Sequence, residues 1–343
     1  MKKLLNTVYI NNPDIYLSVD GETLAINHEG KVIQKVPFHN IESIVTFGYA
    51  GASPALMGKC AKSGTGLVFM DRNGHFIART EGKVKGNVLL RRQQYRYADD
   101  KEKSLDIAKN IISAKIFNSR YVLERMIRDH GARIDTELFC KKSGFLKNSV
   151  NNARECSDID SLRGIEGEAA SVYFSVFNDM ILQQKDDFRF TTRNKRPPLD
   201  NVNALLSFTY SLTTGMCADA LESVGLDPYV GYMHTDRAGR CSLALDLVEE
   251  FRSVLCDRFV LTVINKRLVT DDDFTKREDG AVFLNEKGRK NFLTAWQKRK
   301  EEELRHPFIE EKVEWGMLPY VQSLLLARYI RGDLDCYPPF IWK

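Results

Sequence analysis

The sequence predicts an α+β protein. A small amino-terminal β domain, a sheet or sandwich, covers residues 1–87, and a larger all-helical domain covers residues 88–343. Two observations predict this class. Short runs with alternating or β-branched residues fill the first part of the chain, and after them apolar residues recur at helical spacing. A chain of 343 residues is long enough for two domains with hydrophobic cores.

The amino-terminal strands are expected where β-branched and aromatic residues lie between turn residues, as at Asn12-Pro13-Asp14 and Asp20-Gly21. A short helix is expected at 54–63. The expected strands are 7–10, 15–19, 23–26, 32–36, 41–47, 66–70 and 75–78.

The carboxy-terminal helices are expected where apolar residues repeat with a helical period, with Gly86, Gly225 and Gly332 marking breaks or ends. Between two of them, residues 183–199 contain many charges and the pair Pro197-Pro198, which predicts a loop. The expected helices are 104–129, 158–182, 200–214, 216–224, 242–265, 286–303 and 316–331.

Composition excludes several classes of protein. With 43% hydrophobic and 28% charged residues, the chain is typical of soluble globular proteins, and it has no run of 18 apolar residues to span a membrane. The amino terminus lacks the apolar segment of a signal peptide, so a cytoplasmic location is expected. Seven cysteines without a Cys-x-x-Cys pair disfavour a zinc site and a disulfide framework, and no P-loop supports nucleotide hydrolysis.

A carboxylate on an inward helix face is the first candidate for chemistry. Glu166 lies four residues after Leu162 and three before Ala169, so it shares their apolar face, whereas Glu168 points away. A buried carboxylate must be paired or bound to a metal. Either a metal or a buried salt bridge to Lys or Arg satisfies this requirement.

Two further acids lie on the helix expected to start near Ser242, which we interpret as the N-cap of that helix. Asp246 and Glu249 are three residues apart and therefore neighbours on the helix surface. Two like charges there repel unless a cation lies near them; the alternative is that both simply favour the positive end of the helix dipole.

An imidazole completes the candidate set. His234 follows the turn residues Asp227-Pro228, and a histidine in that setting is either a ligand or a packed or surface residue. Two or three carboxylates with one imidazole form a ligand set for Mg²⁺ or Mn²⁺. Asn203 lies on an apolar helix face, where its amide either positions a ligand or caps helix packing.

Basic residues are arranged in clusters, although the net charge is only +4. The clusters lie at 83–96, 193–196 and 287–300, and two further arginines lie beside His234. Together they favour a path for a phosphate backbone. For any single cluster the alternative is a solvated face. A divalent cation with such clusters suggests phosphodiester chemistry. The candidate DNA-binding residues are Arg91, Arg92, Arg193, Arg196, Arg237 and Arg240.

Four motifs occur in this order along the chain: GIEGEAA (164–170), PLDNVNALLSF (198–208), DPYVGYMH (227–234) and SLALDLVEEFR (242–252). Together they resemble the CRISPR-associated adaptation integrase (Cas-one) family, over nearly the whole chain. Ala238 stands where a proline is expected, which bears on loop rigidity only. The pattern looks most like the branch found with subtype I-C systems.

The resemblance implies a metal-dependent DNA endonuclease and integrase that inserts short duplex spacers into a CRISPR array. It implies that Glu166, His234 and Glu249 are the catalytic metal ligands, with Asp246 as an accessory acid, and that the β domains form a homodimer. It also implies a partner, the small "Cas-two" protein that bridges two dimers. The competing hypotheses are a non-enzymatic DNA scaffold and a DNA-repair nuclease that works alone.

Overall fold

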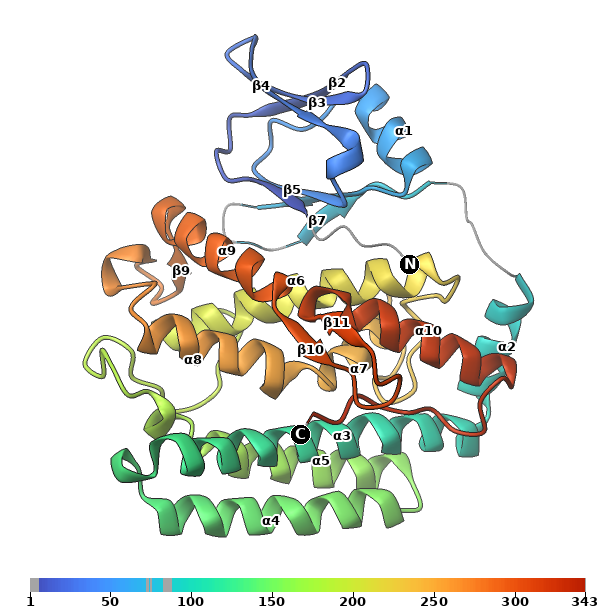
Figure 1. Cartoon of the computed structure of the whole chain (residues 1–343), viewed down its shortest axis with the longest axis vertical. Helices are drawn as coiled ribbons and strands as arrows, with labels where there is room; N and C mark the ends of the chain where they lie inside the picture. Colours follow the sequence, from blue (N-terminus) through green and yellow to red (C-terminus); the bar gives the residue numbers. More distant parts are fainter. Residues whose placement is uncertain (1–5, 72–73, 75, 83–87, 343) are drawn as a thin grey trace.

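The computed structural model describes residues 6–71, 74, 76–82 and 88–342, and it places a β domain on top of a larger helical domain (Figure 1). The predicted α+β class is confirmed. The expected domain boundary after residue 87, the expected break at Gly86 and the basic residues Lys83 and Lys85 lie outside the described residues; helix α2 begins at Val88.

The β domain contains two sheets. A three-stranded antiparallel sheet has the order β2-β3-β4, and a four-stranded mixed sheet has the order β1-β5-β6-β7. The strands are β1 (Thr7–Ile10), β2 (Tyr16–Asp20), β3 (Thr23–His28), β4 (Lys31–Pro37), β5 (Ser43–Phe47), β6 (Gly66–Met70) and β7 (Phe76–Arg79). Helix α1 (Pro54–Ser63) connects the parallel strands β5 and β6, and its ends are set by Ser53, which caps Leu56 N, and by the left-handed Gly64.

The four-stranded sheet is buried on both faces. On β5, Ile44 belongs to the core of the β domain, whereas Val45 and Phe47 belong to the core of the helical domain, as the two-residue period of a strand requires. The Phe47 ring lies 6.0 Å from the ring of Phe208 on helix α6. The two domains therefore share one hydrophobic core.

Nine helices form the described part of the larger domain, with α3, α4 and α5 in the layer farthest from the β domain (Figure 1). They are α2 (Val88–Asp99), α3 (Lys101–His130), α4 (Thr136–Glu155), α5 (Ile159–Phe174), α6 (Asn201–Ser223), α7 (Ser242–Glu249), α8 (Arg258–Asn265), α9 (Glu286–Glu301) and α10 (Leu318–Arg331). No helix among the described residues is both long and apolar enough to cross a bilayer.

Three expectations about this domain need correction. Two short hairpins, β8–β9 (Phe274–Lys276, Val282–Leu284) and β10–β11 (Glu303–Arg305, Lys312–Glu314), interrupt the helices, so the domain is not all-helical. The expected helices 200–214 and 216–224 are one helix, α6, because packing on nearly every side outweighs the cost of Gly215. Helix α4 was not predicted, although its buried Phe139, Leu146, Val150 and Ala153 recur at helical spacing; Ser143 and Ser149 lie on the same face.

The expected helix 242–265 is divided by a π-helical turn at Arg252–Asp257, between α7 and α8. In this turn Cys256 N donates to Phe251 O, five residues earlier. Residues five apart lie about 140° apart around an α-helix, but they nearly overlie each other where hydrogen bonds run from i to i+5. Arg252 and Asp257 therefore face the same side.

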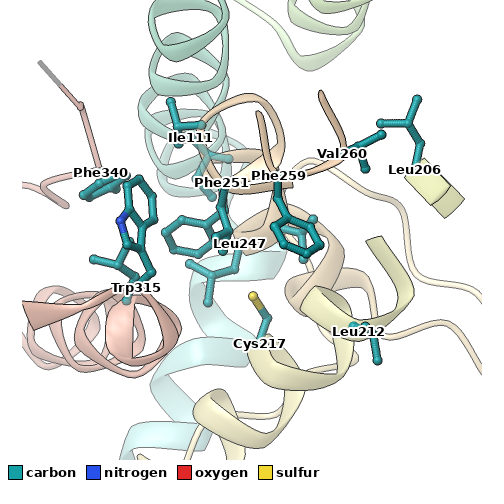
Figure 2. Packing of buried hydrophobic residues seen from close by; sticks show 14 of the residues in the cluster. Ile111, Leu206, Leu212, Cys217, Leu247, Phe251, Phe259, Val260, Trp315 and Phe340 are labelled. Atoms are coloured by element: carbon teal, nitrogen blue, oxygen red, sulfur yellow. The ribbon is translucent and has the colours of Figure 1, made fainter. Parts of the chain in front are cut away.

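The core beneath this turn holds the carboxy-terminal segment in place. Figure 2 shows Leu247 and Phe251 close to Trp315 and Phe340, and the ring centroids of Phe251 and Phe340 are 5.9 Å apart. Asn118 of α3 donates to the carbonyl oxygens of Glu250 (2.9 Å) and Phe340 (2.8 Å). The end of the chain thus fixes α7 against α3.

Candidate metal and DNA site

Three helices bring the acidic centre together. Glu166 on α5 and Glu249 on α7 both face the ammonium of Lys115 on α3. Lys115 Nζ contacts Glu166 Oε1 and lies 2.7 Å from Glu249 Oε2, and the Glu249 side chain is only 4% exposed. The inward position predicted for Glu166 is correct, and so is the outward position of Glu168, which is exposed. Sequence reasoning allowed a salt bridge at Glu166, and Lys115 is its partner.

The second pair joins His234 to Asp246. Asp246 is fully buried and its Oδ1 lies 2.6 Å from His234 Nδ1. The same carboxylate accepts the backbone N–H groups of Tyr232 (2.6 Å), Met233 (3.0 Å) and His234 (2.9 Å). Because a carboxylate only accepts, Nδ1 carries a proton, and in the neutral imidazole Nε2 is then the nitrogen with the free lone pair.

The loop that carries His234 is packed tightly on the start of α7. A Cβ on Gly231 would lie 2.7 Å from Ser242 Cβ and 2.8 Å from His234 O, so only glycine fits there. Ser242 is not the N-cap that the sequence predicted: the cap position is Cys241, and Ser242 Oγ donates to Thr235 O at 3.1 Å. A serine that favours capping is used here to fasten the His234 loop.

The charges around Glu249 keep it ionised. Burial raises the pKa of the Glu249 carboxyl, but the charge of Arg252 and then that of Lys115 outweigh burial and lower the pKa to about 2. Arg252 Nη2 lies 3.1 Å from Glu249 Oε1. Glu249 therefore remains an anion over the whole physiological range of pH.

No three His, Cys, Asp or Glu side chains gather closely enough to hold a metal ion among the residues that the structure describes. Glu166 and Glu249 come together at Lys115, and His234 and Asp246 form a separate pair. One atom nevertheless fits a cation: Glu249 Oε2 is buried and has no hydrogen bond of good geometry, although Lys115 Nζ is close. A buried carboxylate oxygen without a donor is suited to a cationic ligand.

A cavity of about 530 Å³ opens beside the acids and combines their negative charge with basic and phenolic groups. Its polar lining includes Lys115, Glu166, Arg193, Tyr210, Arg252 and Asp257. Tyr210 Oη donates to Asp257 Oδ1 at 2.5 Å, and the guanidinium of Arg252 lies 4.8 Å from the centre of the Tyr210 ring. Burial raises the pKa of Asp257 to about 6, although Tyr210 and Arg252 oppose this effect.

Asn203 holds the loop that carries Arg193. Its Oδ1 accepts from Arg193 Nη1 (2.7 Å), and its Nδ2 donates to Thr192 O (2.8 Å) and Asp200 Oδ2 (2.7 Å). Asn203 is fully buried. The sequence offered two roles, positioning a ligand or a phosphate and capping helix packing; the observed bonds instead hold a basic side chain at the cavity.

The other predicted DNA-binding residues are dispersed. Arg92 on α2, Arg196 and Arg237 are exposed. Arg91 is half-buried, and its Nε lies 3.3 Å from Gly225 O. Arg240 Nη2 donates to Thr235 O, so its guanidinium fastens the His234 loop. Of the six, Arg193 alone lines the cavity beside the acids.

Sequence reasoning missed four side chains at this site, namely Lys115, Arg252, Tyr210 and Asp257. Lys115 carries a signal that could have found it, because it interrupts the apolar stripe of α3 between Ile111, Ile112 and Val122. A lysine on an inward face predicts a buried acid on a neighbouring helix. Arg252 and Asp257 carried no such signal, since their common direction depends on the π-helical turn.

Comparison with known proteins was made against families, curated sequences and solved structures. The family described as "CRISPR associated protein Cas1" matches residues 8–298. The "CRISPR-associated endonuclease Cas1 2" of Rhodospirillum rubrum is 49% identical over 347 residues, covering 100% of both chains.

Two solved structures share the fold. A casposase bound to an integration product has a TM-score of 0.85 at 22% identity, covering 98% of this chain and 94% of its own. A chain of a Cas6-RT-Cas1–Cas2 complex has a TM-score of 0.81 at 21% identity, with coverage of 98% and 36%. Since the family match spans most of the sequence and the Rhodospirillum protein aligns from end to end, this chain belongs to the CRISPR-associated Cas1 family.

Proposed function

We propose that this protein is a divalent-metal-dependent DNA endonuclease and integrase of CRISPR adaptation. The observation that carries the proposal is the meeting of two carboxylates from separate helices, Glu166 and Glu249, at the edge of a cavity lined by Arg193 and Arg252. Metal-dependent phosphodiester chemistry has two requirements. Acidic groups must hold the cation, and basic groups beside them must hold the phosphate. The family match supports the same activity.

The residues proposed to hold Mg²⁺ or Mn²⁺ are Glu166, His234 and Glu249. His234 offers Nε2, because Asp246 binds its Nδ1, and Glu249 offers the buried oxygen that lacks a hydrogen bond. Asp246 uses both of its oxygens on the His234 loop, so we assign it a positioning role. When bound, the cation supplies Lewis acidity, which polarises the phosphodiester and stabilises the charge that develops on it.

The side chains of the cavity orient the nucleic acid. Arg193 and Arg252 are placed to neutralise the phosphate, and both are held in position, Arg193 by Asn203 and Arg252 by Glu249. The attacking oxygen belongs to water in hydrolysis and to a DNA 3′-hydroxyl in integration. Either oxygen displaces an oxygen at phosphorus, so one arrangement of side chains serves both reactions without a covalent enzyme intermediate.

The proposed substrates are double-stranded DNA of two kinds, the incoming protospacer and the CRISPR repeat. A casposase of the same fold is described as bound to an integration product, and another neighbour belongs to a complex with Cas2. These likenesses support DNA and a bridging Cas2 protein as partners. We further propose a homodimer formed through the β domains, a cytoplasmic location and the branch found with subtype I-C systems; a repeat array and subtype I-C genes beside this gene would test the branch.

The direct test replaces each proposed ligand. We expect Glu166→Gln, His234→Ala and Glu249→Gln to abolish strand transfer of a short duplex into a repeat substrate, each by about 10³-fold or more. A double variant should be little worse than a single one, because the ligands act as a unit. The matched control is Glu168→Gln, an exposed acid on the same helix as Glu166.

Full activity in the His234→Ala protein would exclude the proposed ligand set. Activity that needs no divalent cation would exclude the metal. If the protein binds DNA but neither cleaves nor joins it under any metal, the DNA scaffold is the correct function. Efficient cleavage without Cas2 and without any joining of spacer to repeat would favour the DNA-repair nuclease.

A further inference from the structure

A buried lysine lies where the two proposed metal-binding acids meet. Lys115 is 8% exposed and extends from the inward face of α3. Its ammonium contacts Glu166 Oε1 and lies 2.7 Å from Glu249 Oε2. The lysine thus joins two carboxylates that come from different helices and lie 83 residues apart in sequence.

The acids need a positive charge whether or not a metal is present. Glu249 is 3% exposed, and the Glu166 side chain is 26% exposed. Because both carboxylates contact the same ammonium, they lie close together, and two like charges at that separation repel. Arg252 lies near Oε1 of Glu249, on the other oxygen from Lys115. Lys115 therefore supplies the charge on the side where Glu166 and Glu249 face each other.

A divalent cation bound by Glu166 and Glu249 would need the oxygens that Lys115 now faces. Lysine is suited to give way, because its charge sits at the end of a flexible four-carbon stem. Lys115 also lines the cavity beside the acids, so its ammonium has open space into which it can move.

We infer that Lys115 is the resident counter-ion of the proposed metal site, and that a divalent cation binds by displacing its ammonium from Glu166 and Glu249. The inference rests on the proposed function and adds a positioning residue to it. Lys115 keeps the two carboxylates together while the site waits for metal, and it makes metal binding weaker than the acids alone would allow.

The inference predicts opposite effects on metal affinity and on the stability of the metal-free protein. Lys115→Met keeps most of the length and apolar stem but removes the charge. Metal then no longer competes with an ammonium, so we expect Mn²⁺ to bind at least about tenfold more tightly. Without metal the carboxylates repel each other, so the melting temperature in chelator should fall by at least about 5 °C and recover with Mn²⁺.

The experiment uses the full-length chain without DNA and with Mn²⁺ alone as the probe. Calorimetric titration gives the affinity, and thermal unfolding in EDTA and in Mn²⁺ gives the stability. The matched control is Lys101→Met, which removes an exposed lysine from the same helix and should change neither quantity. Unchanged or weaker Mn²⁺ binding by Lys115→Met would overturn the inference.

A second variant covers the case in which Lys115→Met does not fold. Lys115→Gln also removes the charge, but its amide can still donate a hydrogen bond to Glu166 or Glu249. It should again tighten Mn²⁺ binding, and an affinity equal to that of the unmodified protein would reject displacement.

Failure of the proposed function gives a different result. If the unmodified protein does not bind Mn²⁺, or binds it no more tightly than Glu249→Gln does, the metal site itself is wrong. If the unmodified protein binds Mn²⁺ and Lys115→Met binds it equally well, the metal site stands and only the role of Lys115 is lost.

Discussion

Asp246 shows how one buried side chain can organise a loop. It accepts four hydrogen bonds, three from consecutive backbone N–H groups and one from the His234 ring. A carboxylate in that position fixes both the direction of the imidazole and the nitrogen that carries its proton. The sequence placed Asp246 among the candidate ligands, but its spacing could not reveal that both oxygens are occupied.

The role of Asp246 predicts the effect of Asp246→Asn on metal binding. The amide retains the size of the side chain. If its N–H faces His234 Nδ1, which must itself donate, the hydrogen bond is lost and the His234 ring loses its orientation. We expect Mn²⁺ affinity to fall about 10- to 100-fold, measured by calorimetry. Asp236→Asn, an exposed acid on the same loop, is the control and should bind normally. Wild-type affinity in Asp246→Asn would remove the positioning role.

Asp257 predicts a dependence of stability on pH. Its pKa rises from 3.8 in the unfolded chain to about 6 in the folded protein, first because of burial. The folded protein therefore binds this proton more tightly, and the stabilisation is complete below pH 3.8 and lost as the pH rises through 6. Asn cannot ionise, so the variant does not lose this stability. Between pH 4 and pH 7 the free energy of unfolding of Asp257→Asn should therefore rise by about 3 kcal/mol relative to that of the wild type.

Urea unfolding of both proteins at several pH values measures that difference. A free-energy difference that stays constant between pH 4 and pH 7 would show that Asp257 is ionised throughout. Tyr210→Phe removes the hydrogen bond to Asp257 and should shift the window further upward, because that bond favours the charged form.

At the scale of elements, the sequence predicted most strands and the strongly amphipathic helices, and failed where packing decides. The expected helix 54–63 agrees with α1 because Ser53 and Gly64 are local signals for its two ends. Ser143 and Ser149 interrupt the apolar face of helix α4, and the continuity of α6 through Gly215 depends on its neighbours. Similarly, helical spacing could predict Glu166 and Glu249 as candidates. It could not predict that Lys115, which is distant in sequence, lies between them.

Helix α2 presents a basic face whose contribution to DNA binding can be measured. Arg92 is exposed, whereas Tyr95 Oη donates to Asp227 and so ties the helix to the loop before His234. If this face follows the DNA backbone, Arg92→Ala should lower the slope of log K against log salt by about 0.9, the value for one phosphate contact. Adding Arg91→Ala should lower it further.

Binding titrations of a duplex at several salt concentrations give this slope. The control is Lys147→Ala, an exposed lysine on α4, the outermost helix of the layer farthest from the β domain (Figure 1). A slope that Arg92→Ala leaves unchanged would mean that α2 does not contact DNA.

At the scale of the whole molecule, side chains of the β domain pack into the core of the helical domain. Phe208 of α6 packs against Phe47 of the β domain, at 6.0 Å between ring centroids, and against Phe292 of α9, at 5.3 Å. Asn11 also donates to Glu286 O at 2.7 Å, across the same boundary. The family and its endonuclease and integrase function, expected from the sequence, are confirmed by the comparisons, and this shared core fixes the β domain relative to the site.

The shared core predicts a single unfolding transition. Phe208→Ala should lower the free energy of unfolding by about 3–5 kcal/mol, since it removes a buried ring at the junction. Differential scanning calorimetry should show one transition for the wild type and a lower, still single, one for the variant. Phe208→Leu should lose less, and two separate transitions in the wild type would refute the shared core.

The π-helical turn at Arg252–Asp257 accommodates one additional residue without changing the direction in which the side chains on either side of it point. An α-helix turns 100° per residue, so an inserted or deleted residue normally re-aims everything that follows it. The wide turn absorbs one residue, so α7 can aim Glu249 at α3 while Phe259 of α8 packs on Trp296. Relatives of different length can therefore differ at this turn without disturbing either helix. A chain shortened there by one residue would still fold around the same core, but Arg252 and Asp257 would diverge.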